Sequence, residues 1–122
     1  MATFTLGPER RLRRAADFKQ LYASGRRIGG ELFTAVVRPN MLGAPRLGMS
    51  IAARSVRRAV QRNRVRRVIR ESFRKHYAEL PALDIVVGAR SGVQAMTNSR
   101  LRDSLDGLWH KIAISCARSP VS

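Results

Sequence analysis

Apolar residues recur at helical spacing in the middle of the chain. Val65, Val68, Ile69 and Phe73 fall on one arc when successive residues are placed around an α-helix. We therefore expect a helix that begins at residue 56 or 59 and ends near residue 77. Pro81 follows a few residues later, as is common after a helix end.

A second helical stripe lies near the end of the chain. It is formed by Leu101, Leu105, Leu108 and Ile112, with Trp109 beside it, and predicts a helix over residues 100–117. The loop before it ends in three residues that favour helix N-caps, namely Thr97, Asn98 and Ser99.

Three stretches between these points have the pattern of strands. Residues 31–39 are rich in β-forming residues and end at a proline, and residues 46–53 follow after the turn residues 40–45. We expect these two strands to form a hairpin. Residues 83–89 form a short apolar run typical of a strand buried on at least one face. The pattern also allows a short strand at residues 27–30.

The beginning of the chain predicts one more helix. In residues 14–24 the side chains of Phe18, Leu21 and Tyr22 share a face, and Gly25 is a suitable C-terminal stop. The element order is then α-β-β-(β)-α-β-α. It predicts one α+β domain over residues 1–122, an α-β sandwich with helices packed on a small sheet. Residues 1–13 are expected to form an extended basic arm and residues 118–122 a tail without order.

Charge changes this picture from fold to partner. The chain has 24 Lys and Arg against 8 Asp and Glu, a formal net charge of +16, and 44% hydrophobic residues. So positive a domain with a core of its own favours a polyanionic partner. Arginine, which pairs with phosphate through its planar fork, supplies nearly all of this charge.

The central helix concentrates that charge. Residues 54–75 contain ten Lys or Arg and one acidic residue, Glu71. Around the helix the polar positions next to the apolar arc are Asn63, Arg66, Arg67, Arg70 and Arg74, with Arg62 at the border. A solvated helix that only aids solubility would mix charge signs, and a membrane-surface helix would be anchored by Trp. We therefore interpret residues 54–75 as a nucleic-acid-binding element.

Other chemistries find little support. Cys116 is the only cysteine, which fits a reducing compartment, so we expect a cytoplasmic protein. No apolar run is long enough to cross a membrane. His76 and His110 have no partners at metal-ligand spacing, and Asp103 with Asp106 is the one close acidic pair, so neither a metal site nor a protein-only nuclease is expected.

The residues RNRVRR at positions 62–67, read with their flanks, resemble the protein subunit of bacterial ribonuclease P. The resemblance extends in order to LRRAADFKQLYASG (12–25), GMSIAA (48–53), LPALDIVVGA (80–89) and LRDSLDGLWHK (101–111). It implies a sandwich with a left-handed βαβ crossover, similar to one domain of a small-subunit ribosomal protein. It also implies removal of the 5′ leader from precursor tRNA, with the chemistry performed by an RNA subunit and its magnesium ions and not by the protein.

The resemblance further implies two groups of binding residues. One docks on the catalytic RNA and comprises Arg57, Arg58, Arg62, Asn63, Arg64, Arg66, Arg67, Arg70 and Arg74. The other lines a cleft for the single-stranded leader and comprises Phe18, Tyr22, Phe33 and Ser50. Two departures stand out, since an aromatic position of some members is Val36 and a common glycine is Arg57. No metal or cofactor bound by the protein alone, no membrane and no obligate protein partner are expected.

Two alternatives stay open at the level of sequence. Size and composition also suit a ribosomal or ribosome-associated RNA-binding protein. Without the resemblance, Phe18, Tyr22 and Phe33 would be interpreted as core residues, because aromatic side chains on a helix or strand face are more often core than ligand platforms.

Overall fold

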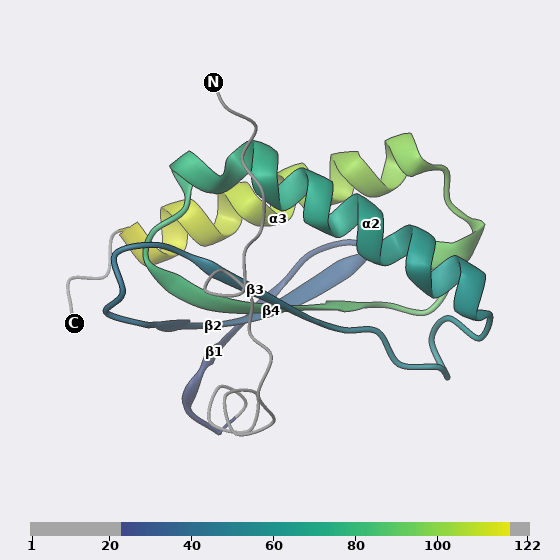
Figure 1. Ribbon diagram of the computed structural model, residues 1–122, viewed down its shortest axis with the longest axis horizontal. Coiled ribbons are helices and arrows are strands. Elements are labelled where there is room, and N and C mark those ends of the chain that lie inside the picture. The colour runs from purple at the N-terminus through teal and green to yellow at the C-terminus, as the bar shows by residue number, and fades with distance from the viewer. Residues whose placement is uncertain (1–22, 118–122) are drawn as a thin grey trace.

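A computed structural model describes residues 23–117 of the chain (Figure 1). Its strands and helices follow in the order β1 (Arg26–Gly29), β2 (Phe33–Pro39), β3 (Arg46–Ser50), α2 (Ala59–His76), β4 (Leu83–Ala89) and α3 (Asn98–Ala117). Two short 3₁₀ helices, η2 (Tyr77–Glu79) and η3 (Val93–Ala95), flank β4. Ala23 and Ser24 are helical, and the rest of the first predicted helix, the N-terminal arm and the C-terminal tail lie outside the described residues.

The domain has two layers in the described range. The four strands form one sheet in the order β1-β2-β4-β3, and α2 and α3 lie side by side over one face of it (Figure 1). β2 is antiparallel to both β1 and β4, whereas β3 and β4 are parallel. Helix α2 connects this parallel pair, which gives the expected βαβ crossover and confirms the α+β architecture.

The predicted hairpin of residues 31–39 and 46–53 is wrong. β4 lies between β2 and β3 and pairs with β2 from Phe33↔Ala89 to Pro39↔Leu83. β4 is the most continuously apolar strand, and the centre of the sheet buries it on both faces, with Ile85, Val86 and Val87 all at most 2% exposed. The loop between β2 and β3 therefore spans a strand instead of making a tight turn.

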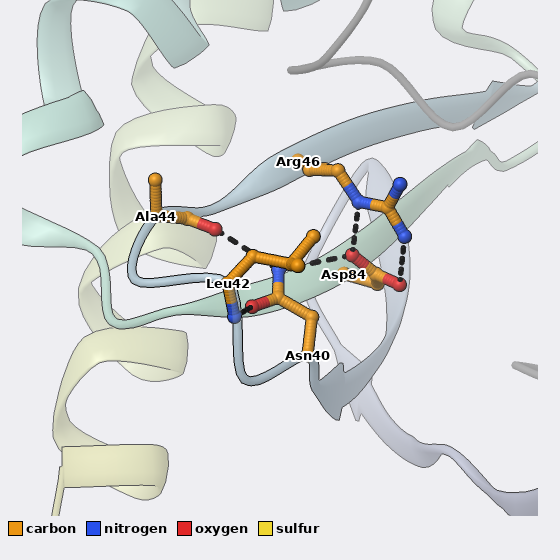
Figure 2. Close-up of polar contacts among 5 residues, drawn as sticks. All are labelled: Asn40, Leu42, Ala44, Arg46 and Asp84. Atoms are coloured by element: carbon orange, nitrogen blue, oxygen red, sulfur yellow. Dashed lines mark hydrogen bonds and ion pairs between the residues drawn. The ribbon is translucent and has the colours of Figure 1, made fainter.

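The carboxylate of Asp84 lies between the two ends of this loop and binds residues at both (Figure 2). Asp84 of β4 accepts two hydrogen bonds of 2.8 Å from Arg46 at the start of β3. It accepts a third, of 3.0 Å, from the side-chain amide of Asn40 just after β2. The same amide donates to the carbonyl of Ala44, and the Asn40 oxygen accepts from the backbone N–H of Leu42. Asp84 thus ties the ends of both neighbouring strands to the central one.

The core lies between the sheet and the two helices. From α2 it contains Val65, Val68, Ile69 and Phe73, and from α3 it contains Leu101, Leu105, Leu108, Trp109 and Ile112, as the apolar stripes predict. The helices are also joined by a buried hydrogen bond of 2.7 Å from the indole N–H of Trp109 to the hydroxyl of Ser72. The Phe73 and Trp109 rings meet edge to face, with centroids 5.8 Å apart.

Both ends of α3 agree with the sequence. Thr97 is the residue that caps it, because its hydroxyl accepts a 3.1 Å hydrogen bond from the N–H of Arg100. Near the other end Cys116 packs against the core as a partly buried side chain. That burial raises the pKa of its thiol, against an opposing effect of Arg26, which fits a packing role better than a reactive one.

Candidate nucleic-acid interface

Helix α2 presents a cationic face beside its buried side. Val65, Val68, Ile69, Ser72 and Phe73 are buried, which fixes the rotation of the helix about its axis. The arc next to these residues, here called the α2 arc, consists of Asn63, Arg66, Arg67, Arg70 and Arg74, all exposed or partly exposed. A guanidinium array attached to so well packed a helix needs little ordering to meet a row of phosphates.

The α2 arc contains four arginines and no acidic residue. The Arg66 guanidinium donates to the side-chain oxygen of Asn63 at 3.3 Å, and Arg67 is exposed. The first turn of α2 contains no acidic residue, and Glu71 on the flank is the single acidic side chain of the helix. The sequence of the helix therefore supplies much more positive than negative charge, which favours an external anion.

Arg62 and Arg64, the two arginines of the RNR triplet, point elsewhere. One guanidinium nitrogen of Arg62 donates to the carbonyl oxygens of Val56 at 2.9 Å and Arg57 at 2.7 Å. Arg64 donates to the side chains of Gln61 and Asn98 and to the carbonyl of Gln94. Both side chains are thus engaged with the protein, one with the segment before α2 and the other with the start of α3.

The segment before α2 carries further exposed arginines. Arg54, Arg57 and Arg58 are all exposed, and Arg58 is the N-cap residue of α2 without a side-chain capping bond. Arg57 and Arg58 therefore lie next to the first turn of the helix, where they extend the cationic surface as expected. Arg54 was not among the predicted residues, although the charge run that contains it was visible in the sequence.

A second surface lies on the sheet face turned away from α2 and α3. Strand register places Thr34 opposite Gly88 and Gly88 opposite Ser50, in one row across β2, β4 and β3. A Cβ atom at Gly88 would lie 3.2 Å from the Thr34 hydroxyl and 3.5 Å from the Ser50 carbonyl, so a larger residue would fill this row. Val36, Val86 and Gly48 form the next row. Together these positions form the second sheet face, which contains the predicted Ser50.

Phe33 is a correction to the predicted leader cleft. Its side chain is 0% exposed and belongs to the core under the helices, together with Ala35 and Val37. The ring therefore offers no surface on which a base could stack. Val36, at the position that is aromatic in some members of the resembled family, lies in β2 on the second sheet face. Phe18 and Tyr22 lie outside the described residues.

Residues 23–117 contain neither a group of metal-ligating side chains nor a helix suited to cross a membrane. No group of three His, Cys, Asp or Glu side chains within this range is arranged to hold a metal ion. None of the helices in the same part of the chain is long and apolar enough to cross a membrane.

Comparison with known proteins agrees with this geometry. The family model described as "Ribonuclease P" matches residues 6–113. The chain belongs to the ribonuclease P protein family. The curated "Ribonuclease P protein component" of Chromohalobacter salexigens is 43% identical over 103 residues, which cover 84% of this chain and 80% of that protein.

Solved structures of ribonuclease P proteins have the same fold. That of the Staphylococcus aureus protein at 2.0 Å matches with a TM-score of 0.77 and 30% identity, and covers 89% of this chain and 95% of its own. That of the Thermotoga maritima protein matches with a TM-score of 0.76 and 29% identity, and covers 84% and 96%. Membership of the family implies association with the ribonuclease P RNA and involvement in tRNA processing.

Proposed function

We propose that the chain is the RNA-binding subunit of a ribonuclease P holoenzyme, in which the RNA subunit cleaves the 5′ leader from precursor tRNA. The α2 arc, extended by Arg57 and Arg58, docks on the catalytic RNA. The observation that supports this assignment is a rigid row of arginines backed by fully buried side chains on the same helix. Magnesium in the holoenzyme is assigned to the RNA subunit, as the resemblance to the ribonuclease P family implies.

The single-stranded leader is assigned to the second sheet face. Gly88 and Ser50 keep one row of this face small, so an extended strand of nucleotides could lie close to the backbone there. Thr34 and Ser50 offer hydroxyl groups on the same row for hydrogen bonds to phosphate or ribose. Phe18 and Tyr22 are kept as proposed stacking residues, worth about 1–3 kcal/mol for each stacked base.

Reconstitution tests the proposed function. The purified chain alone should cleave nothing. Mixed with ribonuclease P RNA and precursor tRNA at low magnesium, it should restore leader removal, because cationic side chains replace part of the screening that high magnesium provides. Equal cleavage rates with and without the chain, under low salt and low magnesium, would exclude the proposed role.

Cross-linking tests the two surfaces separately. A photoreactive group attached to Ser50→Cys, in a Cys116→Ser background, should cross-link to the leader of bound precursor tRNA. The same group at Arg67→Cys should cross-link to the catalytic RNA. If both positions label the same RNA with equal yield, the separation into two surfaces is wrong.

A further inference from the structure

The segment 52–58 has no regular secondary structure, yet three sets of contacts fix its position. Its backbone turns back on itself, since the N–H groups of Ser55 and Val56 both donate to the carbonyl of Ala52 at 3.0 Å. The Val56 side chain is fully buried in the core. The Arg62 guanidinium, one turn into α2, binds the carbonyls of Val56 and Arg57. Three exposed arginines, Arg54, Arg57 and Arg58, are attached to this one segment.

These contacts give Arg62 a different position from its neighbours in the motif. Asn63 and Arg67 are exposed, whereas Arg62, Arg64 and Arg66 are partly buried, and Arg62 is the one that binds the segment before α2. Its bonds to two consecutive carbonyls fix the peptide units at Val56 and Arg57. Bonds with a charged donor are stronger than neutral ones, so their loss would release the segment more than loss of an ordinary hydrogen bond.

We propose that Arg62 is a positioning residue, which orders segment 52–58 so that Arg57 and Arg58 are held ready for the RNA. This inference rests on the proposed function for its purpose, although its structural part stands on the free protein. Without the Arg62 bonds the same arginines could still reach phosphate. The segment would then have to become ordered on binding, at a cost in affinity.

Limited digestion of the free, full-length protein by trypsin tests the structural part. Arg62→Gln should accelerate cleavage after Arg54, Arg57 and Arg58 about tenfold, because local opening of the segment becomes easier. Arg64→Gln removes the same charge from the same helix but acts on the loop before α3. It should therefore leave these three sites unchanged and accelerate cleavage after Arg90. Equal cleavage of segment 52–58 in the wild type and in Arg62→Gln would overturn the proposal.

Salt dependence of binding to ribonuclease P RNA separates positioning from direct contact. Arg62→Gln should weaken binding about tenfold at every salt concentration, with the slope of log affinity against log salt unchanged, because the phosphate contacts re-form. Arg66→Gln, which removes a proposed direct contact, should reduce that slope by about 0.9. A slope reduced equally by both variants would show that Arg62 contacts phosphate directly.

If circular dichroism shows that Arg62→Gln does not fold, a variant that keeps the charge can be digested in its place. Arg62→Lys places a single ammonium where the planar fork was, so cleavage after Arg57 should still increase several-fold. If trypsin cut Arg62→Lys at the same rate as the wild type, the proposal would be overturned. If the wild-type chain bound no RNA at all, the proposed function would fail, and the digestion would still decide whether Arg62 holds the segment.

Discussion

Helices α2 and α3 share one core but differ in what they present outside it. Both bury a complete apolar stripe against the same sheet face, and Trp109 of one binds Ser72 of the other. Outside the core, α2 has seven Lys and Arg against one acidic residue, whereas α3 has three against two. The two helices therefore achieve similar packing with very different charge.

The outer side of α3 shows how this protein balances charge where no partner is proposed. Arg100 at its start forms an ion pair with Glu31, and the hydrogen bond and the charge of Glu31 raise the pKa of that guanidinium. Asp106 lies 3.4 Å from His76. The charge of α2 is one-sided by comparison, with seven Lys and Arg against Glu71, and this difference supports the proposal that α2 faces the RNA.

The largest effects should come from substitutions of buried residues, which α2 and α3 pack against the sheet in the same way. Ile69→Ala in α2 and Leu105→Ala in α3 should each lower the free energy of unfolding by about 2–5 kcal/mol, because both residues are fully buried. Urea denaturation measures both. A cost below about 1 kcal/mol for either variant would mean that its helix does not share the core equally.

The next largest effect should come from removing charge, which should weaken RNA binding when it is removed from α2 but not when it is removed from α3. Arg66→Ala with Arg70→Ala should weaken binding to ribonuclease P RNA about 10- to 100-fold and reduce its salt slope by about 1.8, since two phosphate contacts are lost. Arg102→Ala with Lys111→Ala removes the same charge from α3 and serves as the control. Equal losses for the two pairs would show that net charge, and not its arrangement on α2, governs binding.

The bond between the helices should affect stability without affecting RNA binding. Trp109→Phe leaves the buried Ser72 hydroxyl without its indole partner, which costs about 1–3 kcal/mol. For a domain of this size each kcal/mol corresponds to roughly 4–8 °C in Tm. Adding Ser72→Ala should recover part of the loss. RNA affinity measured well below the Tm should stay that of the wild type, and a large drop would mean that the angle between the helices sets the shape of the α2 arc.

Changes on the outer side of α3 should have the smallest effect. Asp103→Asn and Asp106→Asn raise the net charge by two, yet the free energy of unfolding should change by less than about 1 kcal/mol, because both carboxylates are exposed. RNA affinity should rise less than about threefold, since neither residue is a proposed contact and salt screens exposed charges. If RNA affinity rose by as much as it falls in the α2 variants, the proposed difference between α2 and α3 would be wrong.

The sequence predicts most of this fold through local periodicity. The buried residues of α2 and α3, the bounds of β4 and the choice of residues 97–99 for the cap all follow from side-chain spacing. The hairpin prediction failed because strand pairing is not local: the partner of both β2 and β3 is β4, which comes more than 30 residues after β3 begins. No spacing rule could have shown that Asp84 binds both Asn40 and Arg46.

The candidate site divides in the same way. The α2 arc follows from the helical period, so Asn63, Arg66 and Arg67 were found from sequence. Arg62 and Arg64 bind acceptors whose positions depend on the tertiary fold, and their contacts were not foreseen. The resemblance assigned Phe33 to the leader cleft, whereas the interpretation from the residues alone, a core side chain in a strand, is the one that the structure confirms.

The central place of β4 has a consequence for synthesis of the chain. On the ribosome β2 and β3 emerge first, and each then has an unpaired backbone edge that only β4 can satisfy. Helix α2 also emerges before the strand that completes its sheet. A nascent chain shorter than about 89 residues therefore exposes two apolar strands and the inner side of a helix. Folding of the complete sheet becomes possible late in translation, and premature termination leaves at most the β1-β2 pair, an aggregation-prone fragment with unpaired edges.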